Sequence, residues 1–195
     1  MINFPLPILG FAAWSGTGKT TLLSQIIPLL KAKGLRIALI KHAHHSFDID
    51  HPGKDSHILR KAGADEVVIA SKHRIACVRE TPSNQEEPSL KDMLSVIQID
   101  QVDLVMVEGF KMADIPKVEL HRKRLNKPYL YPQDTNIIAI AEDSDTDIPG
   151  HGIKNLDLDQ PEQVAAFVEG FIRQQPRLTN VSQLDDEPRL CYAMH

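Results

Sequence analysis

The segment Ala13–Thr21 contains the residue types that bind polyphosphate. It reads Ala-Trp-Ser-Gly-Thr-Gly-Lys-Thr-Thr and directly follows the apolar run Pro7–Ala12. Small residues let the backbone curl until successive N–H groups face an anion, and a following helix adds its positive N-terminal end. In this arrangement the lysine reaches the β- and γ-phosphate oxygens, and the next threonine hydroxyl can bind Mg²⁺. The segment therefore predicts a phosphate-binding loop for a nucleoside polyphosphate.

One position departs from the usual pattern of such loops. The pattern opens with glycine, whereas this chain has Ala13 there. Gly16 and Gly18 still supply the tight part of the turn, so the departure is modest. We expect the phosphates to contact seven consecutive residues: Ser15, Gly16, Thr17, Gly18, Lys19, Thr20 and Thr21.

A metal-binding carboxylate is expected from the apolar run Asp103–Gly109. In open α/β sheets, ligands gather at the carboxyl ends of the strands. Asp103 and Glu108 are separated by about 16 Å along an extended strand, so only Glu108 lies at the correct end. We predict that Glu108 holds Mg²⁺, directly or through water, or orients an attacking water, which makes it the candidate catalytic residue. Asp103 is interpreted as a structural residue where the strand begins.

The loop that follows the second predicted strand should border the same phosphates. It contains Asp48 and Asp50, which point the same way in an extended segment, so either can approach the metal. Mg²⁺ needs only one or two carboxylates besides water and phosphate oxygens. We favour Asp50, which gives Thr20, Asp50 and Glu108 as the predicted metal ligands. Lys41, at the strand end, is predicted to add positive charge near the triphosphate.

The same loop is rich in histidine, which raises the alternative of a zinc or related transition-metal site. Its histidines are His42, His44, His45 and His51. His42 and His44 would share a face of an extended segment, but His45 would not. Beside a phosphate loop, hydrogen bonding to phosphate, water or a pterin-like ring is the favoured interpretation.

The nucleotide base is harder to assign from residues. The guanine-binding pattern Asn-Lys-x-Asp is absent, because Asn126-Lys127-Pro128-Tyr129 begins like it but lacks the aspartate. Asp143 directly follows the predicted strand Ile137–Ala141 and is therefore predicted to meet the base. The residues alone do not choose between GTP and ATP.

Composition excludes several classes of protein. The chain has 195 residues, 42% hydrophobic and 25% charged, with a net charge of −4, which argues against a general nucleic-acid-binding surface. Cys77 and Cys191 are too far apart to suggest a disulfide framework. No apolar stretch approaches the roughly 20 residues that span a membrane. Met1–Leu9 lacks the features of a signal peptide. We expect a soluble cytoplasmic protein.

Apolar runs alternate with helical patterns, as in a βαβ protein. The expected strands are Ile8–Ala12, Arg36–Ile40, Glu66–Ala70, Arg74–Glu80, Asp103–Val107, Lys117–His121 and Ile137–Ala141. The expected helices are Lys19–Lys33, Asp55–Ala62, Leu90–Ile97 and Pro161–Gln175. This order predicts a three-layer α/β/α fold of the P-loop NTPase type, with a mainly parallel sheet and an antiparallel edge. We expect one nucleotide-binding domain over 1–175 and a flexible or docking tail over 176–195.

Several phrases of the sequence together resemble one family, the molybdopterin-guanine dinucleotide biosynthesis adaptor (MobB) proteins. The resemblance rests on Phe11–Leu22, Ile40–His45, Asp48-Ile49-Asp50, Pro52–Ser56, Leu59–Ala64 and Val107-Glu108-Gly109-Phe110-Lys111. It spans about Pro7 to Gln174. The phosphate loop alone is widespread, but the histidine-rich loop with Val-Glu-Gly-Phe-Lys is far more specific.

The resemblance implies a P-loop protein that binds GTP with Mg²⁺, usually as a homodimer, with at most weak GTPase activity. Such proteins are thought to assist the guanylyltransferase that joins GMP to the molybdenum-bound pterin, and whether molybdopterin itself binds is left open. Matching positions place Ser15–Thr21 on the phosphates, Thr20 and Asp50 near Mg²⁺, and Glu108 on the far side of the metal. Related P-loop dimers often have an extra lysine early in the loop. Trp14 stands there instead, which fits a slow hydrolase or a pure binder.

Two alternatives remain. A P-loop small-molecule kinase would need an acceptor-binding lid and further arginines at the phosphates. Arg122 and Arg124 follow a predicted strand, but nothing resembles a lid. A metallochaperone would use the histidine-rich loop to hold a transition metal.

Overall fold

The computed structural model describes residues 2–43, 48–81, 87–143 and 152–175. The chain divides into two compact units. The first, here called the sheet unit, comprises Met1–His42 and Leu90–His195, and the second, the hairpin unit, comprises Ala43–Ser89. The predicted tail over 176–195 lies outside the described residues, and the single domain over 1–175 stays a prediction.

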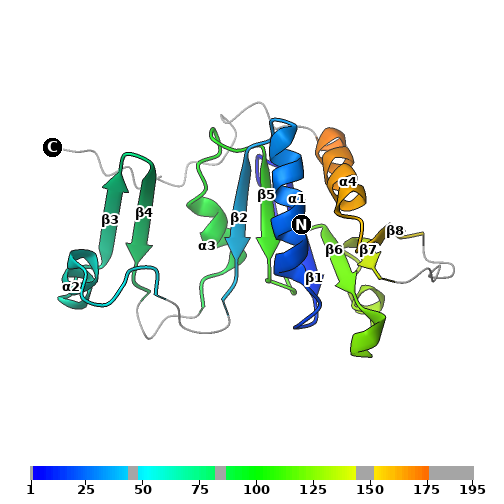
Figure 1. The fold of residues 1–195 in the computed structure, drawn as a ribbon, viewed down its shortest axis with the longest axis horizontal. Helices are drawn as coiled ribbons and strands as arrows, with labels where there is room; N and C mark the ends of the chain where they lie inside the picture. Colours follow the sequence, from blue (N-terminus) through cyan, green and yellow to red (C-terminus); the bar gives the residue numbers. More distant parts are fainter. Residues whose placement is uncertain (1, 44–47, 82–86, 144–151, 176–195) are drawn as a thin grey trace. The chain divides into compact units, whose positions relative to one another are not determined.

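A six-stranded sheet forms the centre of the sheet unit, in the order β2-β5-β1-β6-β7-β8 (Figure 1). Its strands are β1 (Ile8–Ala13), β2 (Ile37–Lys41), β5 (Leu104–Glu108), β6 (Lys117–His121), β7 (Ile137–Glu142) and β8 (Lys154–Asp157). Every neighbouring pair is parallel. The carboxyl ends of these strands therefore lie along one edge, and the loops that follow them are brought together there.

Alternation along β1 divides its side chains between two hydrophobic cores. Phe11 faces the first core, which the helices α1 (Lys19–Ala32) and α4 (Pro161–Gln174) cover from one side of the sheet (Figure 1). Ile8 faces the second core, to which the short helix α3 (Leu90–Ser95) contributes Leu90 and Leu94. Helices on both faces give the three-layer α/β/α architecture predicted from the sequence.

Two 3₁₀ helices, η1 (Lys123–Leu125) and η2 (Tyr131–Gln133), lie in the connection between β6 and β7. The strand β8 was not predicted. Its four residues include only one apolar side chain, Leu156, which is buried, so no alternating pattern marks it in the sequence.

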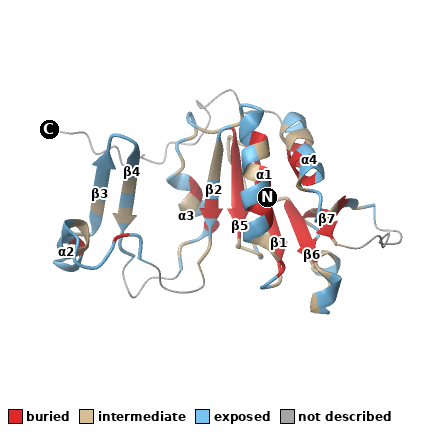
Figure 2. Cartoon of the chain, in the orientation of Figure 1, coloured by how far each residue is buried: buried red, intermediate tan, exposed pale blue. Residues whose placement is uncertain are grey.

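The hairpin unit contains the helix α2 (Asp55–Lys61) and the strands β3 (Glu66–Ser71) and β4 (Arg74–Arg79). The strands pair antiparallel from Glu66 opposite Arg79 to Ser71 opposite Arg74, which confirms the predicted hairpin. They form a two-stranded sheet of their own. Figure 2 shows that much of this unit is exposed, in contrast to β1, β5, β6 and β7 of the six-stranded sheet, which are buried almost throughout. Among the described residues, no helix is long and apolar enough to cross a membrane.

Candidate functional site

The predicted phosphate loop connects the carboxyl end of β1 to the start of α1. Gly16 has φ of 79° and Gly18 has φ of 102°, a backbone region that residues with a Cβ rarely adopt. Between them Thr17 is 2% exposed, and both its backbone N–H and its hydroxyl donate to Trp14 O, at 3.3 and 2.7 Å. The two glycines and the buried threonine therefore fix a tight turn directly before the helix.

The N-terminus of α1 has the features of an anion-binding site. Gly18 stands at the cap position, where it provides no side-chain hydrogen bond, and no acidic residue lies in the first turn. The first backbone N–H groups of a helix have no partner within it, and the helix dipole favours negative charge there. Such an end accepts phosphate without further adaptation of the backbone.

Lys19 is the first residue of α1, and its ammonium donates to Ala13 O at 3.4 Å. Burial lowers the pKa of Lys19 below its ordinary value, and the positive charge of Lys111 adds to this effect. A half-buried ammonium next to a second cation is stabilised by an anion, which is the chemistry expected of the lysine in a phosphate loop.

Glu108 brings together three of the predicted site residues. The Thr20 hydroxyl donates to one of its carboxylate oxygens at 3.0 Å, and Lys41 Nζ lies 3.4 Å from the other. Glu108 ends β5 and Lys41 ends the adjacent strand β2, while Thr20 lies in the first turn of α1, which follows β1 on the other side of β5. A hydroxyl beside a carboxylate supplies two oxygen ligands of the kind that Mg²⁺ prefers.

The chain turns sharply after Glu108. Gly109 has φ of 98° and Phe110 has φ of 48°. A Cβ at Gly109 would lie 2.7 Å from the Cβ of His42, so only glycine fits without displacement of the neighbouring loop. The Phe110 ring lies 4.7 Å from the His42 ring between centroids. His42 N–H also donates to Glu108 O at 2.9 Å, so the loops after β2 and β5 are held together.

Arg122, directly after β6, connects the phosphate loop to Asp143. Its Nε donates to Thr17 O at 3.1 Å, and its Nη1 lies 3.2 Å from the Asp143 carboxylate. Asp143 also accepts a hydrogen bond from Lys123 N–H at 3.1 Å. Partial burial raises the pKa of Asp143, but the hydrogen bonds from Lys123 and Arg122 outweigh it and lower the pKa below its ordinary value. The predicted contact of Asp143 with the base stays a prediction.

In the sequence analysis Arg122 was considered only under the kinase alternative, as a further arginine at the phosphates, and no contact with the phosphate loop was assigned to it. Its position directly after a strand was visible, but the strand order that puts β6 next to β1 was not.

The connection between β6 and β7 is held by buried carboxylates. Glu119, which is fully buried, accepts from the N–H groups of Leu130 and Tyr131 at 2.7 and 2.9 Å. Burial raises the pKa of Glu119 above its ordinary value, against the opposing effect of these hydrogen bonds. Tyr129 stacks on His121 with ring centroids 3.9 Å apart, and its hydroxyl donates to Glu142 at 2.7 Å. This connection therefore has a defined path beside the phosphate loop.

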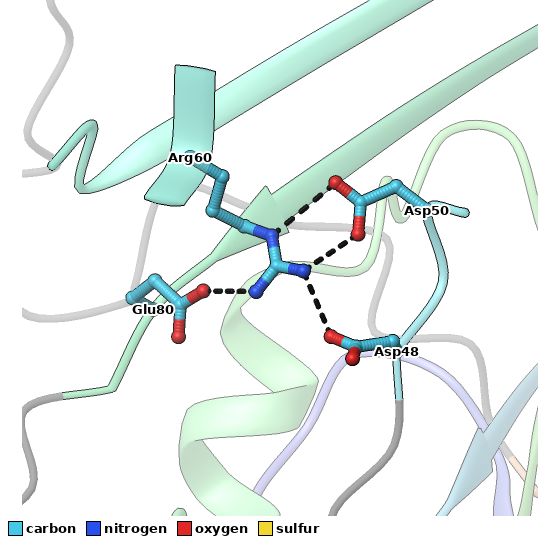
Figure 3. Close-up of polar contacts among 4 residues, drawn as sticks. All are labelled: Asp48, Asp50, Arg60 and Glu80. Carbon is cyan, nitrogen blue, oxygen red and sulfur yellow. Dashed lines mark hydrogen bonds and ion pairs between the residues drawn. The ribbon is translucent and has the colours of Figure 1, made fainter. Parts of the chain in front are cut away.

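Asp50 belongs to the hairpin unit, where it is 9% exposed and pairs with the buried Arg60 (Figure 3). Its two carboxylate oxygens accept from Arg60 Nη2 at 2.6 Å and Nε at 3.3 Å. Asp48 and Glu80 accept from the same guanidinium. The hydrogen bond from Arg60 lowers the pKa of Asp50 below its ordinary value. The structure thus gives Asp50 a partner within its own unit, and its predicted role at the metal stays a prediction.

The predicted site residues thus fall into three sets. The structure brings the phosphate loop, Lys41 and Glu108 together, and Asp143 joins them through Arg122. Asp50 lies in the other unit. His44 and His45 lie outside the described residues, and the described part of the chain contains no cluster of three or more potential metal ligands.

Asp103 has the structural role predicted for it. Its carboxylate accepts from the Arg36 backbone N–H at 2.9 Å and from the Arg36 guanidinium at 3.0 Å, next to the start of β2.

Comparison with known proteins identifies the family. The family model described as molybdopterin guanine dinucleotide synthesis protein B (MobB) matches residues 8–143. The molybdopterin-guanine dinucleotide biosynthesis adapter protein of Escherichia coli is 44% identical over 171 residues, 87% of this chain and 95% of the relative. Its Haemophilus influenzae counterpart is 39% identical over 173 residues, 88% of this chain and 92% of the relative.

A crystal structure of molybdopterin-guanine biosynthesis protein B matches with a TM-score of 0.67 at 29% identity, over 86% of this chain and 99% of the other. The sequence and structure comparisons therefore agree on one family.

Proposed function

The chain belongs to the MobB family of molybdopterin-guanine dinucleotide biosynthesis, and we propose that it works there as an adaptor that binds GTP with Mg²⁺. In this proposal it assists the guanylyltransferase that joins GMP to the molybdenum-bound pterin. The adaptor role itself follows from the relatives, whose names describe it. The nucleotide, the metal and the partner enzyme are the proposed part.

The observation that carries the proposal is the contact between Thr20 and Glu108 at 3.0 Å, at the end of a helix whose first turn has no acidic residue. Gly16 and Gly18, both with positive φ, shape the loop that leads into this helix. A glycine-containing turn, an open helix N-terminus, and a hydroxyl beside a carboxylate are the components that hold a metal-bound polyphosphate. Their combination supports triphosphate binding more strongly than any one of them.

We assign Mg²⁺ to Thr20 and Glu108, with Asp50 as a further proposed ligand. Thr20, in the first turn of α1, and Glu108, at the end of β5, supply neighbouring oxygen atoms, which fits the small number of protein ligands that Mg²⁺ requires. The choice of GTP over ATP rests on the family rather than on a base contact. We propose Asp143 for that contact, because it directly follows β7 and pairs with Arg122, which also donates to Thr17 O in the phosphate loop. We propose that Glu108 can also orient a water molecule for attack on GTP, and that this hydrolysis is slow.

We further propose that the protein is a homodimer. The hairpin unit exposes several large apolar side chains, which supports an interface there. They are Ile49, Ile58, Leu59, Val68, Ile69 and Ile75. Sedimentation velocity at micromolar concentration is expected to give the mass of two chains, whereas a single 21.8 kDa species would contradict this part of the proposal.

Reconstitution with the purified guanylyltransferase tests the adaptor function. Formation of the dinucleotide cofactor is measured at limiting GTP, with and without this protein. The wild-type chain is expected to increase the yield, and Lys19→Ala is not, because it removes the phosphate-binding ammonium. Lys31→Ala, which removes an exposed lysine at the other end of α1, is the matched control and is expected to act like wild type. No effect of the wild-type chain, or an equal effect of Lys19→Ala, would contradict the proposal.

A further inference from the structure

Trp14, the second residue of the phosphate loop, is held on several sides. Its indole N–H donates to Pro128 O at 2.8 Å, which joins the loop to the connection between β6 and β7. Lys111 Nζ lies 5.0 Å from the centre of the indole ring, and Lys127 Nζ lies 5.8 Å from it. Ammonium groups at these distances are attracted to the π face of an indole. The ring therefore keeps lysine side chains at the border of the phosphate loop.

The backbone of Lys111 is fixed as well. It follows Gly109 and Phe110, two consecutive residues with positive φ, of which Phe110 is held by its packing on His42. A residue with a Cβ keeps such a conformation only where its surroundings enforce it. The carbonyl of Lys111 accepts a hydrogen bond at 3.1 Å from Lys117, whose side chain is almost fully buried. The turn at Gly109 and Phe110, together with the hydrogen bond from Lys117, therefore fixes the backbone from which the Lys111 side chain extends to Trp14.

The charges around the loop are unequal. Lys19, Lys41 and Lys111 bring three ammonium groups, while Glu108 is the carboxylate that lies 3.4 Å from Lys41. Lys111 Nζ lies over the ring of Trp14 and Lys19 Nζ donates to Ala13 O, so both ammonium groups contact the first two residues of the loop. Two ammonium groups held near one another repel in the free protein, and a polyanion between them removes that repulsion.

We infer that Lys111 is a second phosphate-binding lysine, which the Trp14 ring positions to donate to the terminal phosphate of a bound nucleoside triphosphate. This inference rests on the proposed function and adds a specificity to it. A diphosphate lacks the group that Lys111 contacts, so Lys111 favours the triphosphate over the diphosphate. Trp14 acts through Lys111 and is a positioning residue.

The test is a calorimetric titration of four proteins with GTP and with GDP in Mg²⁺ buffer: wild type, Lys111→Met, Lys111→Arg and Lys91→Met. Lys111→Met is expected to lower the affinity for GTP about tenfold, as for the loss of one charge-assisted hydrogen bond, and the affinity for GDP by less than about threefold. Lys111→Arg keeps the charge and is expected to stay within about threefold of wild type for both. Lys91→Met, in the exposed part of α3, is the matched control and is expected to change neither.

A second pair of variants tests the positioning by Trp14. Trp14→Phe keeps an aromatic face and loses the indole N–H, whereas Trp14→Leu loses both. The ratio of GTP to GDP affinity is expected to fall further in Trp14→Leu than in Trp14→Phe, and a purely structural role would lower both affinities together. Circular dichroism and thermal melting confirm that each variant is folded.

The outcomes separate this inference from the function on which it rests. If wild type binds GTP and Lys111→Met keeps the wild-type ratio of GTP to GDP affinity, the inference is wrong and the proposed function stands. Equal losses for GTP and GDP would also overturn it, because they place the contact away from the terminal phosphate. If wild type binds neither nucleotide, the proposed function itself fails.

Discussion

Replacement of Lys19 by alanine separates phosphate binding from stability of the fold. In the structure the Lys19 ammonium donates to Ala13 O at 3.4 Å, which is long for a hydrogen bond to a carbonyl. Alanine is the best helix former, and position 19 begins α1. The substitution is therefore expected to change the free energy of unfolding by less than about 1 kcal/mol. The substitution also removes a partly buried charge and its repulsion by Lys111, and both changes stabilise the folded state.

The effect on nucleotide affinity is expected to be much larger. A hydrogen bond between charged groups contributes about 1.5–3 kcal/mol, and about 1.4 kcal/mol corresponds to a tenfold change in the dissociation constant. Loss of one such bond from Lys19 to the β- or γ-phosphate therefore weakens GTP binding by one to two decades.

Calorimetry measures the affinity, and urea unfolding followed by circular dichroism measures the stability of the same samples. Lys31→Ala is the control for loss of a lysine from α1 and is expected to keep wild-type affinity. Wild-type GTP affinity in a folded Lys19→Ala protein would refute the assignment of the phosphate loop. A large loss of stability would refute the claim that Lys19 serves binding rather than folding.

Three further substitutions test other parts of the account. Glu108→Gln removes the charge of a proposed metal ligand beside Thr20. It is expected to reduce the gain in GTP affinity that Mg²⁺ produces, and to change the GTP affinity without Mg²⁺ less. A Mg²⁺ titration measures both quantities. Gly109→Ala is expected to lower the urea midpoint, because the new Cβ would lie 2.7 Å from the His42 Cβ in a backbone conformation with φ of 98°. Asp50→Asn is expected to lower the free energy of unfolding at neutral pH, and to lower it less as the pH falls. Arg60 lowers the pKa of Asp50 in the folded state. The Asp50 carboxylate therefore stabilises the fold fully above the ordinary aspartate pKa, and this stabilisation is lost as the pH falls through the lowered pKa. Urea unfolding between neutral pH and about pH 3 follows that difference.

Each of these has an outcome that would contradict it. An unchanged Mg²⁺ titration would remove Glu108 from the metal site, and an unchanged midpoint for Gly109→Ala would show that the turn adapts easily. For the Arg60 cluster, Asp48→Asn is the matched control, because Asp48 contacts the same guanidinium with a side chain that is 53% exposed. An Asp48→Asn effect as large as that of Asp50→Asn would contradict the importance of burial. A pH-independent difference between wild type and Asp50→Asn would contradict the lowered pKa.

The fold was largely predictable because its signals are local. The apolar run before the loop, the period of α1, and the glycine positions in the loop each lie within one stretch of sequence. The position of Glu108 was predictable for the same reason. Glu108 ends an apolar run of the sequence, and the direction of the chain shows that this is the carboxyl end of the strand, where ligands gather. Local patterns thus located the loop and its nearest carboxylate.

The rest of the site depends on contacts between distant parts of the chain. The hydrogen bond from Trp14 to Pro128 spans 114 positions, and that from Arg122 to Thr17 spans 105. Neither pair has a periodic pattern, because each depends on β6 lying beside β1 in the sheet. The pairing of Asp50 with Arg60 was missed for another reason: Asp50 was considered as a metal ligand, and a cation within its own unit was not considered as its partner.

A calorimetric titration of the wild-type protein with GTP, ATP and GDP in Mg²⁺ buffer, followed by a turnover assay on the same sample, tests the proposed GTP binding. We expect saturable binding with a preference for GTP and very slow hydrolysis. Absence of nucleotide binding, a preference for ATP, or rapid turnover when a small phosphate acceptor is added would contradict it.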